Sequence, residues 1–397
     1  MNSPHPTSHP ADERVAPLFE PFRLRGLTLA NRIVMAPMTR GFSPHGVPGD
    51  DVAAYYRRRA EAGIGLIITE GVGVDHPAAL GGSGVDGDNV PHMYGDDALA
   101  GWRHVVREVH AAGGIIMPQL WHQGVMREMG TGPHPEVESV RPSGIWGPLD
   151  RMTTMPPEYM ERVAKQPGRA MTDEEVVDVI EAFARSARWA MEAGFDGIAI
   201  HGAHGYMVDT FLWEGTNLRT DRWGGDHVGR AAFAVELVKA IRREIGPDPV
   251  INFRFSQWKQ QDFRARLAET PEQLGEILGP IADAGVDIFD GSQRYFDRAE
   301  FEGSPLNIAG WAKKLTGKAA QTVGGVGVSS GLYDSRRDGG SDPALENVHK
   351  VAERLAKGEF DLVGVGRAIM HDPWWTRRIR DGEDLLPYDE NSRLALT

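Results

Sequence analysis

Short apolar runs recur along the chain, each preceded by a stretch with the spacing of an amphipathic helix. The helical stretches end in Ala-x-Gly or a close variant, and an apolar run follows at once, as in AEAG then IGLIITEG over residues 60–71. Glycine at this place is typical of a helix C-cap, and a run that is apolar throughout is typical of a strand buried on both faces of a parallel sheet. The pattern therefore predicts alternating helices and strands.

We predict eight strands from this rhythm, at residues 31–38, 64–71, 114–121, 195–202, 249–256, 286–292, 318–325 and 360–367. The expected helices cover residues 50–62, 96–112, 173–193, 228–245, 271–284, 307–316, 344–357 and 373–381. Eight β–α units in one chain favour the α/β class and a closed (β/α)8 TIM barrel. A doubly wound open sheet is the alternative, but it would need a glycine-rich turn after its first strand, where this chain has APMTRG.

Three kinds of segment lie outside the repeating pattern. FEPFRLRGLTLANR, before the first strand, is expected to form an N-terminal β-hairpin that closes the other end of the barrel. Residues 124–170, after the third strand, are rich in Pro and Gly, and a loop of this length is typically a lid or binding loop. We expect one domain over residues 17–381, between a disordered N-terminal tail (1–16) and a C-terminal tail (382–397).

Composition limits the partners and the chemistry. The 397 residues carry a net charge of −13, which disfavours nucleic acid and anionic membranes as partners. No apolar run has the length of a membrane helix and the first residues lack the apolar core of a secretory signal, so a cytoplasmic protein is expected. The chain contains no cysteine, which removes disulfides, thiolate nucleophiles and cysteine-ligated iron–sulfur clusters.

Residues at the carboxyl ends of the expected strands are the candidates for chemistry, because barrel active sites form there. In chain order they are Pro37, Met38, Thr39, Arg40, Glu70, Gly71, Gln119, Trp121, His122, His201, His204, Tyr206, Arg254, Ser292, Gly324, Gly325, Gly327, Gly364, Gly366 and Arg367. The glycine-rich turns after the last two strands are typical of a phosphate site, where backbone N–H groups face the anion and Arg367 can clamp it. Arg254 lies in an apolar strand and needs either an electron-rich ligand or an internal carboxylate such as Glu70 or Asp290.

The stretch HGAHGY at residues 201–206 leaves three interpretations open. His201 and His204 could hold a metal together with His122, or they could fill the core, although the glycines of this turn do not suit a packed stripe. The third interpretation is a pair of N–H donors that converge on one oxygen and stabilise an enolate there. Tyr206 would then give a proton to the neighbouring carbon.

The motifs NRIVMAPMTR, ITEG, QLWH, HGAHGY, NLRTDRWGG and GVGR occur in an order and spacing that resemble the Old Yellow Enzyme family of FMN-dependent ene-reductases. The resemblance runs from residue 17 to residue 381 and implies FMN in the barrel mouth. It implies flavin contacts for Pro37, Met38, Thr39, Gly71, Gln119, Arg254, Gly324, Gly325, Gly366 and Arg367, the last four at the phosphate. Thr39 would lie near flavin N5 and O4, and Arg254 beside N1 and O2. Trp223 and Asp226 stand where relatives usually have Tyr and Ser.

The resemblance also implies a reaction. NADPH or NADH reduces the flavin, and a small-molecule α,β-unsaturated carbonyl compound then takes the same place, which gives ping-pong kinetics. His201 and His204 bind its oxygen, Trp121 lines the same site, hydride moves from N5 to Cβ, and Tyr206 protonates Cα. The lack of cysteine sets the chain apart from related barrels that carry an iron–sulfur cluster and further domains.

Several alternatives stay open. The same flavin scaffold could act as a desaturase or isomerase, and a flavin-free, metal-dependent barrel lyase or hydrolase would use the two histidines as ligands. A degenerate barrel that only binds a ligand is disfavoured by the complete set of candidate residues. A monomer and a homodimer both fit the sequence.

Overall fold

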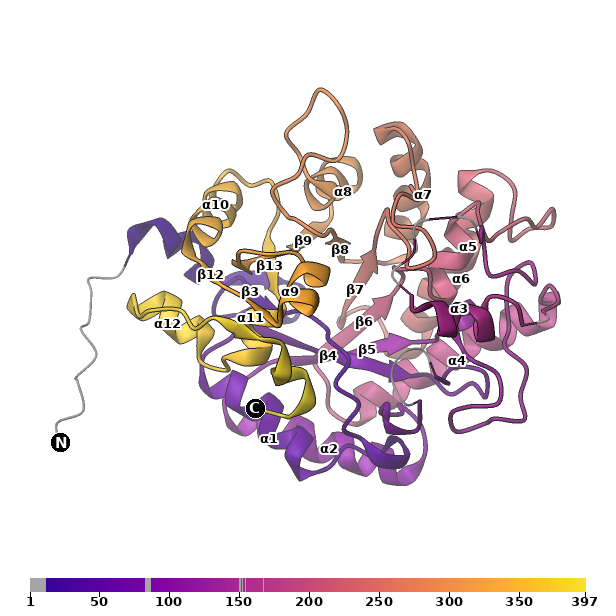
Figure 1. Ribbon diagram of the computed structural model, residues 1–397, viewed down its shortest axis with the longest axis horizontal. Coiled ribbons are helices and arrows are strands. Elements are labelled where there is room, and N and C mark those ends of the chain that lie inside the picture. The colour runs from indigo at the N-terminus through magenta and orange to yellow at the C-terminus, as the bar shows by residue number, and fades with distance from the viewer. Residues whose placement is uncertain (1–11, 83–86, 150, 152, 154, 167) are drawn as a thin grey trace.

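The computed structural model describes residues 12–397 except 83–86, 150, 152, 154 and 167. Eight parallel strands close into a barrel in the order β13, β3, β4, β5, β6, β7, β8, β9 (Figure 1). Their bounds are β3 Ile33–Met35, β4 Leu66–Gly73, β5 Ile116–Trp121, β6 Gly197–His201, β7 Val250–Phe255, β8 Ile288–Ser292, β9 Ala319–Val323 and β13 Leu362–Val365. The predicted TIM barrel is confirmed, and only β4 runs past its expected end, by two residues.

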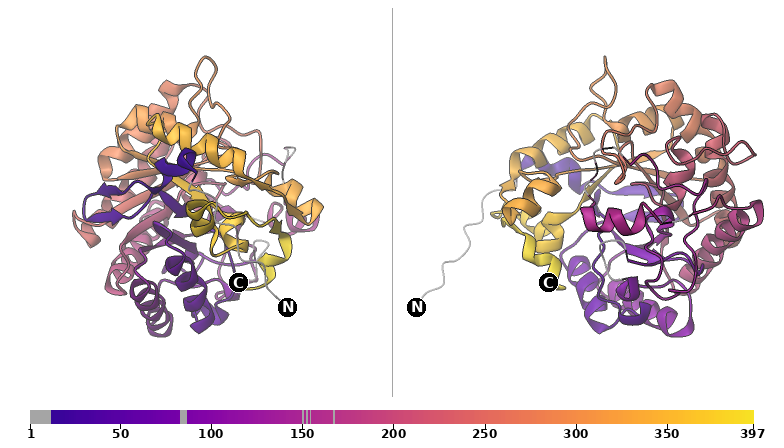
Figure 2. Two further views of the ribbon diagram at one scale, coloured as in Figure 1. Left: turned by 90° about the vertical axis from the view of Figure 1, so that its left-hand side faces the viewer. Right: turned by 45° about the vertical axis from the view of Figure 1, so that its right-hand side comes forward.

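Helices surround the barrel on its outside (Figure 2). The predicted ones are α1 Asp50–Glu61, α2 Asp96–Ala111, α4 Asp173–Glu192, α6 His227–Ile245, α7 Pro271–Ala284, α8 Ile308–Thr316, α10 Leu345–Ala356 and α12 Trp375–Asp381. Local sequence fixes where several of them begin. Thr172 caps α4 and Thr270 caps α7, each in a reciprocal capping box with the third helical residue. Such a box satisfies two backbone N–H groups that the helix itself leaves unpaired.

The barrel interior is apolar at its amino-terminal end. The hairpin of β1 Phe22–Leu24 and β2 Leu27–Leu29 forms as expected. Its buried apolar residues Phe22, Leu27 and Leu29 pack with inward-facing strand residues such as Leu66 and Met117. The hairpin therefore closes this end, and the polar residues of the interior are left at the carboxyl ends of the strands.

The segment between β5 and α4 has a small core of its own. It contains η4 Gly124–Met126 and α3 Pro157–Val163. Trp146 and Tyr159 are buried with three neighbours from η4 and α3, and Tyr206 packs against this cluster from the barrel. The Thr153 hydroxyl donates to the Gln260 carbonyl oxygen, 2.6 Å away, in the loop after β7. This segment thus lies against the carboxyl end of the barrel.

Both ends of the chain differ from the expectation. Glu13–Phe19 form a 3-10 helix, η1, with Val15 and Leu18 buried, so the tail expected over residues 1–16 does not reach residue 16. Residues 1–11 lie outside the described residues. After α12, β14 Tyr388–Asp389 pairs with β11 Gly340–Ser341, and η5 Glu390–Leu394 follows. These contacts are made with distant parts of the chain, which local periodicity does not reveal. In the part of the chain that is described, no helix is both long enough and apolar enough to span a bilayer.

Candidate active site

Strand register brings most of the predicted residues to one place. His201 on β6 pairs with Arg254 on β7, and Gly71 on β4 pairs with Gln119 on β5. A cavity of about 140 Å³ opens at this end. It is lined by Pro37, Thr39, Gly71, Gln119, Trp121, His201, His204, Tyr206, Arg254 and Gln260. All of these except Gln260 were predicted from their positions at strand ends.

The HGAHGY turn presents three side chains to this cavity. His201 ends β6, and Tyr206 is the N-cap of the short helix α5 Met207–Leu212. The ring centroid of His201 lies 5.1 Å from that of His204 and 4.8 Å from that of Tyr206. The rings of Trp121 and Tyr206 are nearly perpendicular, with their centroids 5.0 Å apart, and Trp121 is 2% exposed. The turn thus forms a compact group of two imidazoles and a phenol, packed against a buried indole.

Both imidazoles are neutral at pH 7. Burial lowers the pKa of His201 well below its ordinary value, and the nearby positive charge of Arg254 acts in the same direction. Burial likewise lowers the pKa of His204, with smaller contributions from His201 and Arg254. A neutral imidazole offers one N–H donor and one acceptor nitrogen. The pair can therefore donate hydrogen bonds to an oxygen without giving up a full proton to it.

His204 is held by two side chains. Its Nε2 lies 2.7 Å from the Ser292 hydroxyl oxygen, and the Trp258 ring stacks on it with centroids 4.3 Å apart. Trp258 and Gln260 were not predicted as site residues. They lie in the loop after β7, in RFSQWKQQ, where neither spacing nor residue type gives a signal. Only their placement beside His204 reveals a role.

Arg254 forms the internal ion pair that the sequence offered as one of two alternatives. Its Nε donates to Asp290 Oδ2 at 2.6 Å, and both side chains are buried. Its Nη2 has no hydrogen-bond partner among the described residues. Since an unpaired buried donor is costly, this nitrogen suits an electron-rich ligand in the cavity. The carboxylate orients the guanidinium and leaves one donor for such a ligand, and the predicted contact with the flavin stays a prediction.

The residues predicted at the phosphate do not line the cavity. Gly324 and Gly325 have φ of +141° and +71°, and a Cβ on Gly324 would lie 2.4 Å from the Gln293 carbonyl oxygen, so glycine is required there. Gly366 and Met38 are neighbours, with the Met38 sulfur 3.5 Å from the place of a Cβ on Gly366. The phosphate site stays a prediction.

The guanidinium of Arg367 is engaged elsewhere in this structure. It donates to the carbonyl oxygens of Ser330 at 2.8 Å and Gly331 at 3.2 Å, and to the Ser335 hydroxyl. These bonds hold α9 Leu332–Asp338 against the end of β13. Arg367 would have to give up some of them to clamp a phosphate.

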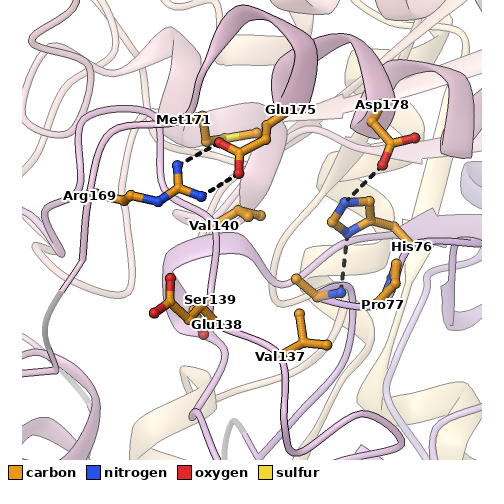
Figure 3. A pocket seen from close by; sticks show the side chains of 11 residues that line it. His76, Pro77, Val137, Glu138, Ser139, Val140, Arg169, Met171, Glu175 and Asp178 are labelled. Carbon is orange, nitrogen blue, oxygen red and sulfur yellow. Dashed lines mark hydrogen bonds and ion pairs between the residues drawn. The ribbon is translucent and has the colours of Figure 1, made fainter.

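His122 does not join the other two histidines. Its Nδ1 accepts from the Gly124 N–H at 3.0 Å, and its Nε2 lies 3.1 Å from Nδ1 of His76. The three-histidine set required by the metal interpretation is therefore not assembled. His76 also borders a second cavity of about 400 Å³, near α4. Charged side chains of that cavity pair with one another, as Arg169 does with Glu175 (Figure 3).

Glu70 holds the loop that carries Thr39. Its Oε2 accepts from the Arg40 N–H at 2.8 Å and the Gly41 N–H at 2.9 Å, and burial raises the pKa of this carboxyl to about 7. We expect Glu70→Ala to lower the free energy of unfolding by about 2–4 kcal/mol, because two buried donors lose their acceptor. Glu70→Gln keeps an acceptor oxygen and should lower the free energy of unfolding far less. Urea unfolding of the two variants at pH 8 tests this, and equal losses would contradict it.

Buried neutral histidines predict a pH dependence of stability. Burial lowers the pKa of His92 to about 4 and those of His122, His201 and His204 well below 6.5. The unfolded chain binds these protons near pH 6.5, so stability is full above that pH and falls as the pH drops. Below pH 6.5 each histidine lowers the free energy of unfolding by about 1.4 kcal/mol per pH unit, until the pH reaches its pKa in the folded protein.

The raised pKa values of Glu70, Asp209, Asp290 and Glu300 act in the opposite direction, since they favour the folded state at low pH. The buried histidines, which include His76, all begin to bind protons in the unfolded chain near pH 6.5, so we expect their effect to decide the direction between pH 7.5 and 5.5. Urea midpoints at pH 7.5, 6.5 and 5.5 should therefore decrease in that order. His92→Gln should reduce the slope by one proton, because it removes one of these histidines and lies outside the cavity. A midpoint that is constant or rises on acidification would contradict the prediction.

The site thus combines a closed barrel, a buried arginine nitrogen without a partner among the described residues, and two imidazoles beside a tyrosine. Comparisons with known proteins show the class of protein to which this site belongs. The model of the NADH:flavin oxidoreductase / NADH oxidase family matches residues 17–309. The chain is 38% identical over 390 residues to 12-oxophytodienoate reductase 7 of Oryza sativa subsp. japonica, covering 95% of this chain and 91% of that protein.

Two further relatives extend the comparison. The chain is 30% identical over 378 residues to 12-oxophytodienoate reductase 2 of Arabidopsis thaliana, covering 95% of this chain and 91% of that protein. A solved structure of morphinone reductase in complex with tetrahydroNAD is similar with a TM-score of 0.75 at 28% identity, covering 97% of this chain and 94% of that one. The chain therefore belongs to the NADH:flavin oxidoreductase / NADH oxidase family, that of Old Yellow Enzyme, and it is an FMN-dependent oxidoreductase that takes electrons from NAD(P)H.

Proposed function

We propose that the protein reduces the activated C=C bond of α,β-unsaturated carbonyl compounds. The observation that carries this proposal is the pair of neutral imidazoles, the buried His201 and the half-buried His204, beside Tyr206 in one cavity. Two N–H donors suit a carbonyl oxygen on which negative charge develops, and a phenol O–H suits the protonation of carbon. The names of the relatives, 12-oxophytodienoate reductase and morphinone reductase, describe reductases and are consistent with this class of reaction.

Each residue of the site has a distinct task in this reaction. Arg254, Gln119 and Thr39 would hold the ring of FMN, which supplies hydride to Cβ of the substrate when it is bound. His201 and His204 bind the carbonyl oxygen, so that the electron pair of the C=C bond is drawn toward it. Tyr206 would give its proton to Cα and regain one from water, so that each turnover consumes one proton. The product is the saturated carbonyl compound, and NADPH or NADH is oxidised by two electrons.

We expect the two substrates to use this cavity in turn. The nicotinamide and the carbonyl compound would each need the face of the same ring beside His201 and Tyr206, which line one cavity. One must leave before the other binds, which gives ping-pong kinetics. Initial rates at several fixed enone concentrations should then give parallel double-reciprocal lines.

A spectroscopic titration tests the proposed reaction. The purified protein should show a flavin spectrum that bleaches when NADPH or NADH is added without oxygen, and comparing the two shows which reductant is preferred. Addition of cyclohexenone should restore the oxidised spectrum and yield cyclohexanone. A protein that bleaches but is not reoxidised by cyclohexenone would overturn the substrate class. Conversion of cyclohexanone to cyclohexenone as the faster direction would favour a desaturase.

A further inference from the structure

Behind the HGAHGY turn lies an ion pair that the proposed reaction does not use. Lys259 Nζ and Asp209 Oδ1 are 2.7 Å apart, and both side chains are 0% exposed. Burial lowers the pKa of Lys259 and raises that of Asp209, so it opposes both charges. A buried pair of this kind gives little stability compared with apolar residues of the same shape. We therefore explain the ion pair by the segments it holds in place and not by a contribution to stability.

The turn beside the pair has an unusual backbone. His204 and Gly205 both have left-handed φ angles, +65° and +82°. This region favours glycine, and a side chain such as that of His204 adopts it only when its surroundings fix it there. The ring of His204 can face the cavity only while this conformation is kept.

The backbone polar groups of these two residues are all bonded to neighbouring segments. The His204 N–H donates to Ser256 Oγ at 3.0 Å, and the His204 carbonyl accepts from the Gln260 N–H at 3.2 Å. The Gly205 carbonyl accepts from Gln261 Nε2 at 3.1 Å. The Gly205 N–H donates to Asp209 Oδ2 at 2.7 Å.

Lys259 joins these bonds into one unit. Its Nζ donates to Asp209 Oδ1 and also to the Ser256 carbonyl oxygen at 2.9 Å. Asp209 lies in the first turn of α5, and Ser256 lies just after β7. The pair therefore ties the segment after β6, which carries His204 and Tyr206, to the loop after β7 that supports His204.

We propose that the Lys259–Asp209 pair positions His204 and Tyr206 for the carbonyl substrate. Lys259 and Asp209 are positioning residues, because neither lines the cavity. This inference rests on the proposed function, in which His204 donates to the carbonyl oxygen. Breaking the pair should therefore weaken the binding of an oxygen ligand more than it changes FMN binding.

The test compares two matched variants. Asp209→Asn removes one charge and keeps an oxygen that can accept from the Gly205 N–H. Asp287→Asn does the same to a buried carboxylate at the other end of the barrel. Asp287 is 4% exposed, accepts from Arg25 Nε at 2.5 Å and Arg242 Nη2 at 2.8 Å, and accepts from the Ile251 N–H at 3.0 Å. The probe is phenol, whose oxygen would accept from the two histidines, and its binding is followed through flavin absorbance.

Asp209→Asn should raise the dissociation constant of phenol and lower kcat/KM for cyclohexenone by about 10–100-fold, the effect of a displaced site group. The dissociation constant of FMN should stay at the parent value. Asp287→Asn should leave all three quantities unchanged, although its melting temperature falls. Equal behaviour of the two variants, or a loss of FMN that accounts for the whole effect in Asp209→Asn, would overturn the inference.

If Asp209→Asn does not fold, the double variant Asp209→Asn/Lys259→Gln replaces it, because it leaves no unpaired charge buried. Gln is shorter than Lys and cannot reach both partners, so phenol binding should stay weakened even where the melting temperature recovers. Recovery of phenol binding together with stability would also overturn the inference. A parent protein that neither reduces cyclohexenone nor binds phenol would instead count against the proposed function.

Discussion

Tyr206→Phe is expected to lower kcat/KM for cyclohexenone by about 10²–10⁴-fold, the usual contribution of a positioned general acid. The hydroxyl is the only group lost, and the ring keeps its contacts with Trp121 and His201. Reduction of the flavin by NADPH needs no proton at a substrate carbon, so its rate should stay close to that of the parent protein. Stopped-flow measurement of the two half-reactions separates these effects.

Tyr159→Phe is the matched control. Tyr159 is a buried tyrosine that packs in the same small core as Tyr206, and its hydroxyl donates to the Met126 carbonyl oxygen. Loss of that hydroxyl should lower the melting temperature and leave the reoxidation by cyclohexenone nearly unchanged. If Tyr206→Phe reduced cyclohexenone at the parent rate, the proton would have to come from another donor, and the role proposed for Tyr206 would be wrong.

The barrel could be predicted because its signals are local and repeated. A glycine such as Gly194 ends a helix, an apolar run follows at once, and the same order occurs around the chain. The elements η1 and β14 at the two ends of the chain had no such local signal. The η1 helix is placed by the burial of Val15 and Leu18, and β14 by its pairing with Gly340 and Ser341. Both depend on the finished fold, so sequence periodicity could not reveal them.

The site was predictable where a residue's position alone decides its role. Strand ends face the cavity of any barrel of this kind, so His201 and Gln119 follow from the strand assignment. The supporting contacts were not predictable. For Arg254 the sequence left open an electron-rich ligand or an internal carboxylate such as Glu70 or Asp290, and only the register of β7 against β8 selects Asp290. Lys259 lies in a loop without periodicity, and its burial depends on Asp209, fifty residues earlier in the chain.

His201→Ala is expected to lower kcat/KM for cyclohexenone by about 10²–10³-fold, the cost of one lost donor to a developing oxyanion. The same change should weaken phenol binding, because the same N–H is missing. His201→Asn carries an N–H donor of its own and should recover part of both losses. The comparison is informative because both imidazoles are held neutral by burial, so their contribution is a hydrogen bond and not a positive charge.

A neutral and a protonated histidine predict different pH dependences of kcat/KM. A protonated histidine would bind an oxygen ligand more tightly as the pH fell through 6.5, whereas a neutral donor adds no such rise in kcat/KM for cyclohexenone between pH 8 and 6. Cyclohexenone has no titrating group in this range, so the profile reports the protein. If Asn and Ala at position 201 gave the same loss, or if the parent profile rose steeply toward pH 6, the neutral-donor role of His201 would be wrong.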